Sequence, residues 1–144
     1  MIKAIALSNH IISLFEEKNC KITNLKLQKV LYYVQGYFFK EFDKEAFPEE
    51  IHGWQYGPVV PMVYYEYSIY GSAPLSSSSE IKSDLCPREQ SLVKKIVDKC
   101  SSISSSKLVD MTHSETPWKT TSMGSIINKK NIKSFFDNNN PLNI

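Results

Sequence analysis

The chain has 144 residues with 17 basic and 15 acidic side chains, a formal net charge of +2 and an apolar fraction of 42%. These values are ordinary for a globular protein, and a chain of this length buries enough surface for one core, so one domain is expected. Arg88 is the only arginine, which argues against a sequence-specific DNA reader, because such readers depend on bidentate arginine contacts. We expect no nucleic-acid partner and no membrane partner, since no apolar run approaches the roughly 20 residues that span a bilayer.

The three cysteines are Cys20, Cys86 and Cys100, and no two of them form a CxxC pair. An odd number at wide spacing argues against a disulfide framework and against a zinc ribbon. The chain also opens without a basic segment followed by an apolar one. We therefore expect a cytoplasmic protein with reduced thiols.

Apolar periodicity predicts two long helices at the start of the chain. Residues 2–18 carry apolar side chains at helical spacing, which favours an amphipathic helix. Thr23 or Asn24 can cap a second helix, which we expect to run to about Lys40 with only one stripe buried. The acidic stretch at 41–50 is then expected to be a solvated loop.

The middle of the chain combines a strand pattern with helix-start signals. Residues 51–56 alternate with period two and predict a short strand, which a Gly-Pro pair ends. Pro61 suits the first turn of a third helix, expected to continue to Tyr70 and to end at Gly71.

Shorter elements are expected in the second half. Residues 72–84 are rich in serine and predict a surface loop, after which Pro87 can open a fourth helix. Ser104 can cap a short fifth helix, and Pro117 can begin a further helical turn. A last helix is expected around residues 131–136.

These elements predict a mainly α fold. We expect a single compact helical domain of about five to six helices, with a small β element near residues 47–57. The domain is expected to cover residues 1–137, and residues 138–144 are expected to form a frayed tail.

The aromatic residues are concentrated in one part of the chain, because 13 of the 17 fall between Tyr32 and Tyr70. One interpretation is that most of them line the core. The other is that some, such as Tyr33, Tyr37 and Tyr65, form an exposed protein-binding patch, since tyrosine is enriched at interfaces.

Three segments, in order, resemble the motifs of the Panacea antitoxin domain family, which includes the SocA-type antitoxins. They are LKLQKVLYYVQG at residues 25–36, IHGWQYGPVVP at 51–61 and THSETPW at 112–118. Residues 132–136 are similar to the closing helix of the family, so the resemblance covers about residues 1–136. On this resemblance, structural roles are expected for Leu27, Gln28, Tyr32, Trp54, Tyr56, Gly57, Pro58, Val59, Pro61 and Gly71.

The resemblance implies an antitoxin that neutralises a co-encoded toxin by direct protein–protein binding, so the expected partner is a toxin from a neighbouring gene. Two alternatives remain open: an adaptor that delivers the toxin to a bacterial protease, and a phage-borne regulatory interaction protein. We expect the toxin-binding surface to lie on the second and third helices and on the segment from His113 to Trp118. The predicted toxin-binding residues are Lys29, Tyr33, Tyr37, Tyr65, His113, Glu115 and Trp118.

An enzyme would need a nucleophile with a base in hydrogen-bond reach. His113, acting with Cys86 or Cys100, is the pairing that the sequence offers for such chemistry. No HExxH, P-loop or GxSxG motif accompanies it. We therefore expect no catalytic residue, no metal and no cofactor, and interpret His113 as a structural residue beside Trp118.

Overall fold

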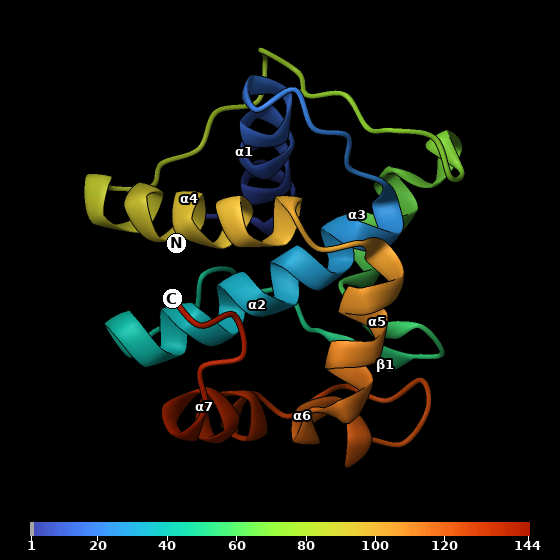
Figure 1. The fold of residues 1–144 in the computed structure, drawn as a ribbon, viewed down its shortest axis with the longest axis vertical. Helices are drawn as coiled ribbons and strands as arrows, with labels where there is room; N and C mark the ends of the chain where they lie inside the picture. The colour runs from blue at the N-terminus through green and yellow to red at the C-terminus, as the bar shows by residue number, and fades with distance from the viewer. Residues whose placement is uncertain (1) are drawn as a thin grey trace.

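The computed structural model describes residues 2–144 as a mainly helical fold with one small antiparallel sheet (Figure 1). This confirms the predicted fold class. The elements, in chain order, are α1 (Ala4–Glu17), α2 (Asn24–Phe42), β1 (His52–Trp54), β2 (Gly57–Val59), α3 (Pro61–Glu66), the 3-10 helix η1 (Ser68–Tyr70), α4 (Pro87–Ser101), α5 (Ser105–Ser114), α6 (Thr116–Lys119) and α7 (Lys129–Asn138).

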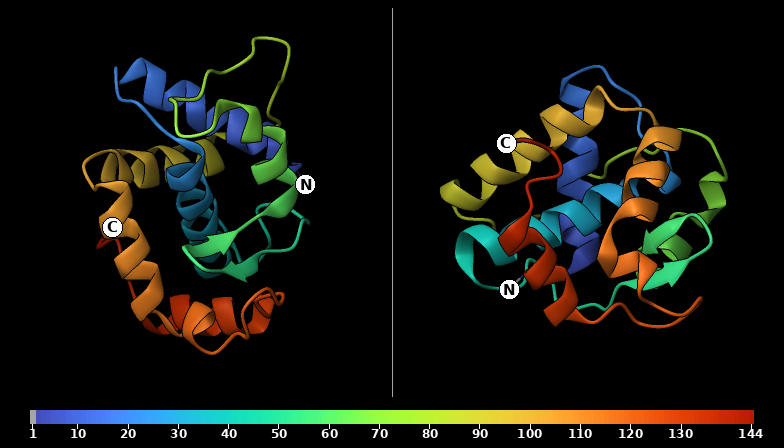
Figure 2. Two further views of the ribbon diagram at one scale, coloured as in Figure 1. Left: turned by 90° about the vertical axis from the view of Figure 1, so that its right-hand side faces the viewer. Right: turned by 60° about the horizontal axis from the view of Figure 1, so that its bottom comes forward.

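Helix α2 is the centre of the fold, and α1, α4, α5, α7 and the sheet all pack against it (Figures 1 and 2). Of the two predicted caps, Thr23 or Asn24, Thr23 is the one that forms, because its side chain accepts a hydrogen bond from the Lys26 backbone N–H. Every residue from Lys26 to Phe39 is buried. The prediction of a single buried stripe is therefore wrong: a helix covered on all sides is a core helix.

The small sheet is a hairpin in which His52 pairs with Val59 and Trp54 pairs with Gly57. The sequence predicted one strand that ends at the Gly-Pro pair. In the structure Gly57 and Pro58 instead begin the second strand, which continues to Val59. Gly57 has a φ of +115°, and a Cβ at this position would lie 2.8 Å from Lys29 Cε. The hairpin turn therefore requires glycine, both for its backbone conformation and for the close approach of α2.

The third helix is shorter than expected. Helix α3 ends at Glu66, and the chain continues through η1 to Gly71, which has a φ of +58°. Residues 2–144 contain seven α-helices, above the five to six expected, and the turn predicted at Pro117 is one of them, α6.

The chain after α7 folds back onto α2. Leu142 is buried, and its backbone N–H donates to Tyr37 Oη at 2.9 Å. The Tyr37 hydroxyl in turn donates to Asn140 Oδ1 at 2.6 Å. The expectation of a frayed end does not describe this segment, because a buried hydroxyl on α2 provides polar partners that no local pattern indicates. None of the helices described combines the length and the apolarity needed to cross a bilayer.

Candidate interaction surface

A chain of buried amides connects α2 to α3. Gln28 Oε1 accepts a hydrogen bond from the Val60 backbone N–H at 2.9 Å, and Gln28 Nε2 donates to Asn24 Oδ1 at 2.9 Å. Asn24 Nδ2 donates to the Tyr64 carbonyl at 3.0 Å. Val60 is the residue before the first turn of α3, so these bonds fix where that helix begins and how it is oriented.

Lys29 connects α2 to the hairpin. Its side chain is fully buried, and Nζ donates to the Pro58 carbonyl at 3.0 Å. Burial lowers the pKa of Lys29 from 10.5 to about 7, because the charged ammonium loses its hydration. The predicted surface position of Lys29 is therefore wrong, and the residue instead holds β2 against α2.

A buried carboxylate joins the end of α5 to α2. Glu115 Oε1 accepts a hydrogen bond from Tyr32 Oη at 2.9 Å, and Oε2 accepts one from Tyr33 Oη at 2.7 Å. Burial raises the pKa of Glu115 from 4.5 to about 7, although both tyrosine hydrogen bonds oppose the shift. The same burial raises the pKa of Tyr33.

Tyr33 and Tyr37, predicted as exposed contacts, are core residues. Tyr33 is 0% and Tyr37 1% exposed, and both rings pack against Phe136 of α7. Glu115 is also buried. A toxin cannot touch these three side chains on the folded surface, so the predicted exposed patch is wrong for Tyr33, Tyr37 and Glu115.

His113 and Trp118 form a stacked pair that contacts the hairpin through Trp118. Their rings stack at a centroid distance of 4.0 Å, and both residues are half-buried. Trp118 Nε1 donates to the Trp54 carbonyl at 2.8 Å. His113 lies beside Trp118 as expected, but it contributes through stacking: its buried Nε2 has no hydrogen-bond partner among the described residues.

The outer side of the hairpin and α3 carries a cluster of exposed apolar residues. Tyr56 is 59% and Tyr65 63% exposed, and the Trp54 ring lies 5.2 Å from that of Tyr64 and 6.0 Å from that of Tyr65. Figure 2, left, turns the face that carries these elements toward the viewer. We call this cluster the aromatic surface and define it as Trp54, Tyr56, Tyr64 and Tyr65.

Sequence reasoning predicted only part of the aromatic surface. Tyr65 was a predicted toxin-binding residue and is exposed, whereas Tyr56 was expected to be structural. Tyr64, whose ring packs against those of Trp54 and Tyr65, was missed.

A groove of about 600 Å³ borders the aromatic surface. It lies between the start of α2, the hairpin turn, Tyr64 of α3 and the chain just after η1. None of its lining residues carries a charge. They are Thr23, Asn24, Leu25, Trp54, Gln55, Tyr56, Tyr64, Gly71, Ser72 and Ser105.

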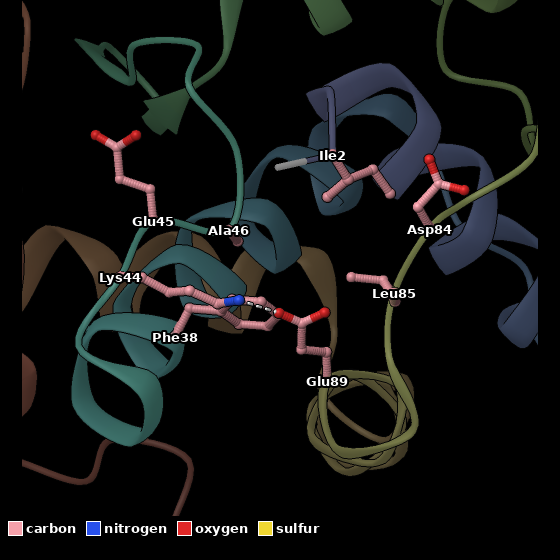
Figure 3. A pocket seen from close by; sticks show the side chains of 8 residues that line it. All are labelled: Ile2, Phe38, Lys44, Glu45, Ala46, Asp84, Leu85 and Glu89. Carbon is pink, nitrogen blue, oxygen red and sulfur yellow. Dashed lines mark ion pairs between the residues drawn. The ribbon is translucent and has the colours of Figure 1, made fainter.

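A second cavity, of about 320 Å³, lies between the loop after α2 and the start of α4 (Figure 3). Ile2, Phe38 and Leu85 form apolar parts of its wall. The Lys44 ammonium pairs with the Glu89 carboxylate at 2.6 Å, as the dashed line in Figure 3 marks. This pair satisfies both charges and ties the loop to α4. No group of three or more His, Cys, Asp or Glu side chains among residues 2–144 could hold a metal ion.

Cys86 and Cys100 were the two cysteines considered as nucleophiles, and the structure argues against Cys100. Cys100 is fully buried, and burial raises the pKa of its thiol to about 12. A thiol in that state is not a nucleophile near neutral pH.

Comparisons with known proteins agree with the sequence motifs. The family described as "Antitoxin SocA-like, Panacea domain" matches residues 27–119, which is more than half of the chain. The chain is also 28% identical over 130 residues to the Antitoxin SocA of Caulobacter vibrioides (strain NA1000 / CB15N), covering 81% of this chain and 69% of that protein. No solved structure shows a significant match. The chain belongs to the SocA-like Panacea domain family.

Proposed function

We propose that this protein is an antitoxin that neutralises a toxin by binding it directly through the aromatic surface. Family membership and the similarity to Antitoxin SocA support the antitoxin role. The observation that carries the binding site is the exposure of Tyr56 and Tyr65 at the hairpin and α3, where the Tyr65 ring packs against those of Trp54 and Tyr64. Exposed apolar clusters of this kind mark interaction sites in soluble proteins, and tyrosine and tryptophan dominate binding energy at interfaces.

The buried network supports this role because it makes the surface rigid. Gln28 and Asn24 fix α3 from α2, while Trp118 bonds to the Trp54 carbonyl. A surface held in its binding conformation loses less conformational entropy when a partner docks. We therefore assign positioning roles to the buried family motif and contact roles to the exposed residues that it carries.

The proposed partner is a toxin protein encoded by a neighbouring gene, with both proteins in the cytoplasm. Neutralisation by occlusion requires only that the aromatic surface covers part of the toxin. Binding alone provides this, so the proposal needs no bond-making chemistry from the antitoxin.

Co-expression tests the proposal. The neighbouring-gene candidate is expressed with the wild type, with a Tyr56→Ala/Tyr65→Ala variant, or with two controls. Tyr65→Phe keeps the ring, and Lys95→Ala changes an exposed residue on α4, away from the hairpin. We expect the wild type and both controls to restore growth and the double variant to lose most of this protection.

Two results would count against the proposal in different ways. Continued toxicity with soluble wild-type protein would reject the toxin pairing. Full protection by the double variant would reject the aromatic surface as the contact site. The half-life of the toxin in the same cells separates the mechanisms, because occlusion leaves the toxin level unchanged whereas delivery to a protease shortens its lifetime.

A further inference from the structure

The groove beside the aromatic surface has a chemistry that selects one class of ligand. Its volume of about 600 Å³ falls within the roughly 300–1,000 Å³ of typical ligand clefts. It is lined by aromatic rings and uncharged polar groups. A ligand charge placed there would lose hydration without gaining an ionic partner, which is unfavourable. An uncharged ligand therefore fits this groove better than a charged one.

The hydrogen-bonding groups of the groove differ from those of the core. In the core, the hydroxyls of Tyr32, Tyr33 and Tyr37 all donate to side-chain oxygens. Among residues 2–144, in contrast, the side-chain hydrogen bonds that Trp54 and Tyr64 make are accepted by their backbone carbonyls, from Trp118 and Asn24. The Trp54 indole N–H and the Tyr64 hydroxyl donate no hydrogen bond to another described residue, so they can donate to a ligand.

Aromatic faces combined with free donors match a polyproline II segment. This helix has no internal hydrogen bonds, so its carbonyls accept bonds from a partner, and proline has no N–H that would need an acceptor. Pro-rich segments dock into aromatic-lined grooves with little loss of entropy because their conformation is already formed. An α-helical segment uses its own carbonyls internally and would leave the groove donors without partners.

We propose that the groove formed by Leu25, Trp54, Tyr56 and Tyr64 binds an uncharged, proline-rich segment of the partner in the polyproline II conformation. This inference rests on the proposed function, since it names the part of the toxin that the antitoxin recognises. The rings hold the proline faces, and the indole and phenol groups donate to the carbonyls of the segment. Asn24 keeps Tyr64 in place through the bond to its carbonyl.

Titration by NMR tests the ligand class directly. The full-length protein contains two tryptophans, so it gives two indole N–H signals, and a Trp54→Phe variant identifies the one from Trp54. The probe is an acetylated, amidated decaproline peptide. We expect the Trp54 signal to move to saturation and the Trp118 signal to move less, because its N–H is already bonded to the Trp54 carbonyl.

Variants define the groove more closely. Tyr64→Phe keeps the ring and removes one donor, so we expect the dissociation constant to rise about fivefold. Ser72→Phe places a ring in the groove without removing any aromatic residue and should abolish binding. Ser76→Phe, at an exposed serine outside the groove, is the matched control and should bind as the wild type does.

The outcomes separate this inference from the proposed function. If decaproline leaves both indole signals unmoved, or if an uncharged alanine–serine decamer or an amphipathic helical peptide binds equally well, the proline proposal is overturned. If Ser72→Phe also fails to neutralise the toxin in that case, the proposed function stands with another kind of segment. Peptide binding that Ser72→Phe abolishes, with neutralisation intact, supports the ligand class and overturns the role of the groove in toxin binding.

Discussion

Replacing the buried carboxylate of Glu115 by an amide should change how stability depends on pH. The Glu115→Gln variant keeps the size of the side chain and one carbonyl oxygen for the tyrosine hydroxyls. The pKa of Glu115 rises from 4.5 to about 7 in the folded protein. This difference of about 2.5 units, at 1.36 kcal/mol each, amounts to roughly 3 kcal/mol of unfolding free energy.

The sign follows from proton binding. Between about pH 4.5 and pH 7 the folded state holds the Glu115 proton and the unfolded state releases it. The free energy of unfolding contributed by this group is therefore present below pH 4.5 and is lost as the pH rises through about 7. The glutamine variant lacks this loss, so its stability relative to the wild type should improve by up to about 3 kcal/mol between these limits.

Urea unfolding of both proteins at several pH values measures the effect, and slopes from other titrating groups cancel in the difference. Glu66→Gln, which neutralises an exposed carboxylate on α3, is the control and should follow the wild-type pH dependence. Parallel curves for the wild type and Glu115→Gln would refute the reasoning, because they would show that Glu115 ionises equally in both states.

Three further substitutions probe the buried network. In the wild type, the folded state releases the Lys29 proton near pH 7 while the unfolded state keeps it, so stability should rise between about pH 7 and pH 10.5. Lys29→Met should abolish this rise, and thermal melts across this pH range measure it. An unaltered rise in the variant would assign the rise to another group. Gly36→Ala should lower the urea midpoint, because the new Cβ would overlap the ring of Phe136 and overpacking costs about 1–3 kcal/mol. This cost outweighs the gain of about 1 kcal/mol in helix propensity. A higher midpoint would mean that Phe136 moves aside freely. Gln28→Ala should cost about 1–3 kcal/mol in calorimetry because it leaves the buried Val60 N–H without its acceptor, and an unchanged melting temperature would contradict that role.

Local signals predicted the elements better than they predicted burial. The caps at Thr23 and Ser104 lie where the sequence placed them, because a cap depends on residues within one turn. Periodicity failed for α2 because it treats polar residues as exposed, whereas Lys29 and Gln28 are buried with hydrogen-bond partners. The partners are the Pro58 carbonyl for Lys29, 29 positions away, and the Val60 N–H for Gln28, 32 positions away. No local pattern indicates partners this distant in the sequence.

The tyrosines show why the candidate site was only partly predictable. Tyr33 and Tyr65 have the same side chain, but Tyr33 finds a buried carboxylate 82 positions away, whereas Tyr65 lies on the outer face of α3 and is 63% exposed. Burial of a hydroxyl is favourable only when an acceptor is available, so the position of Glu115 decides which tyrosine joins the core. Substitutions of Tyr33 should therefore act on unfolding free energy, and those of Tyr65 on toxin affinity. Measuring both quantities for each variant separates the supporting network from the contact surface.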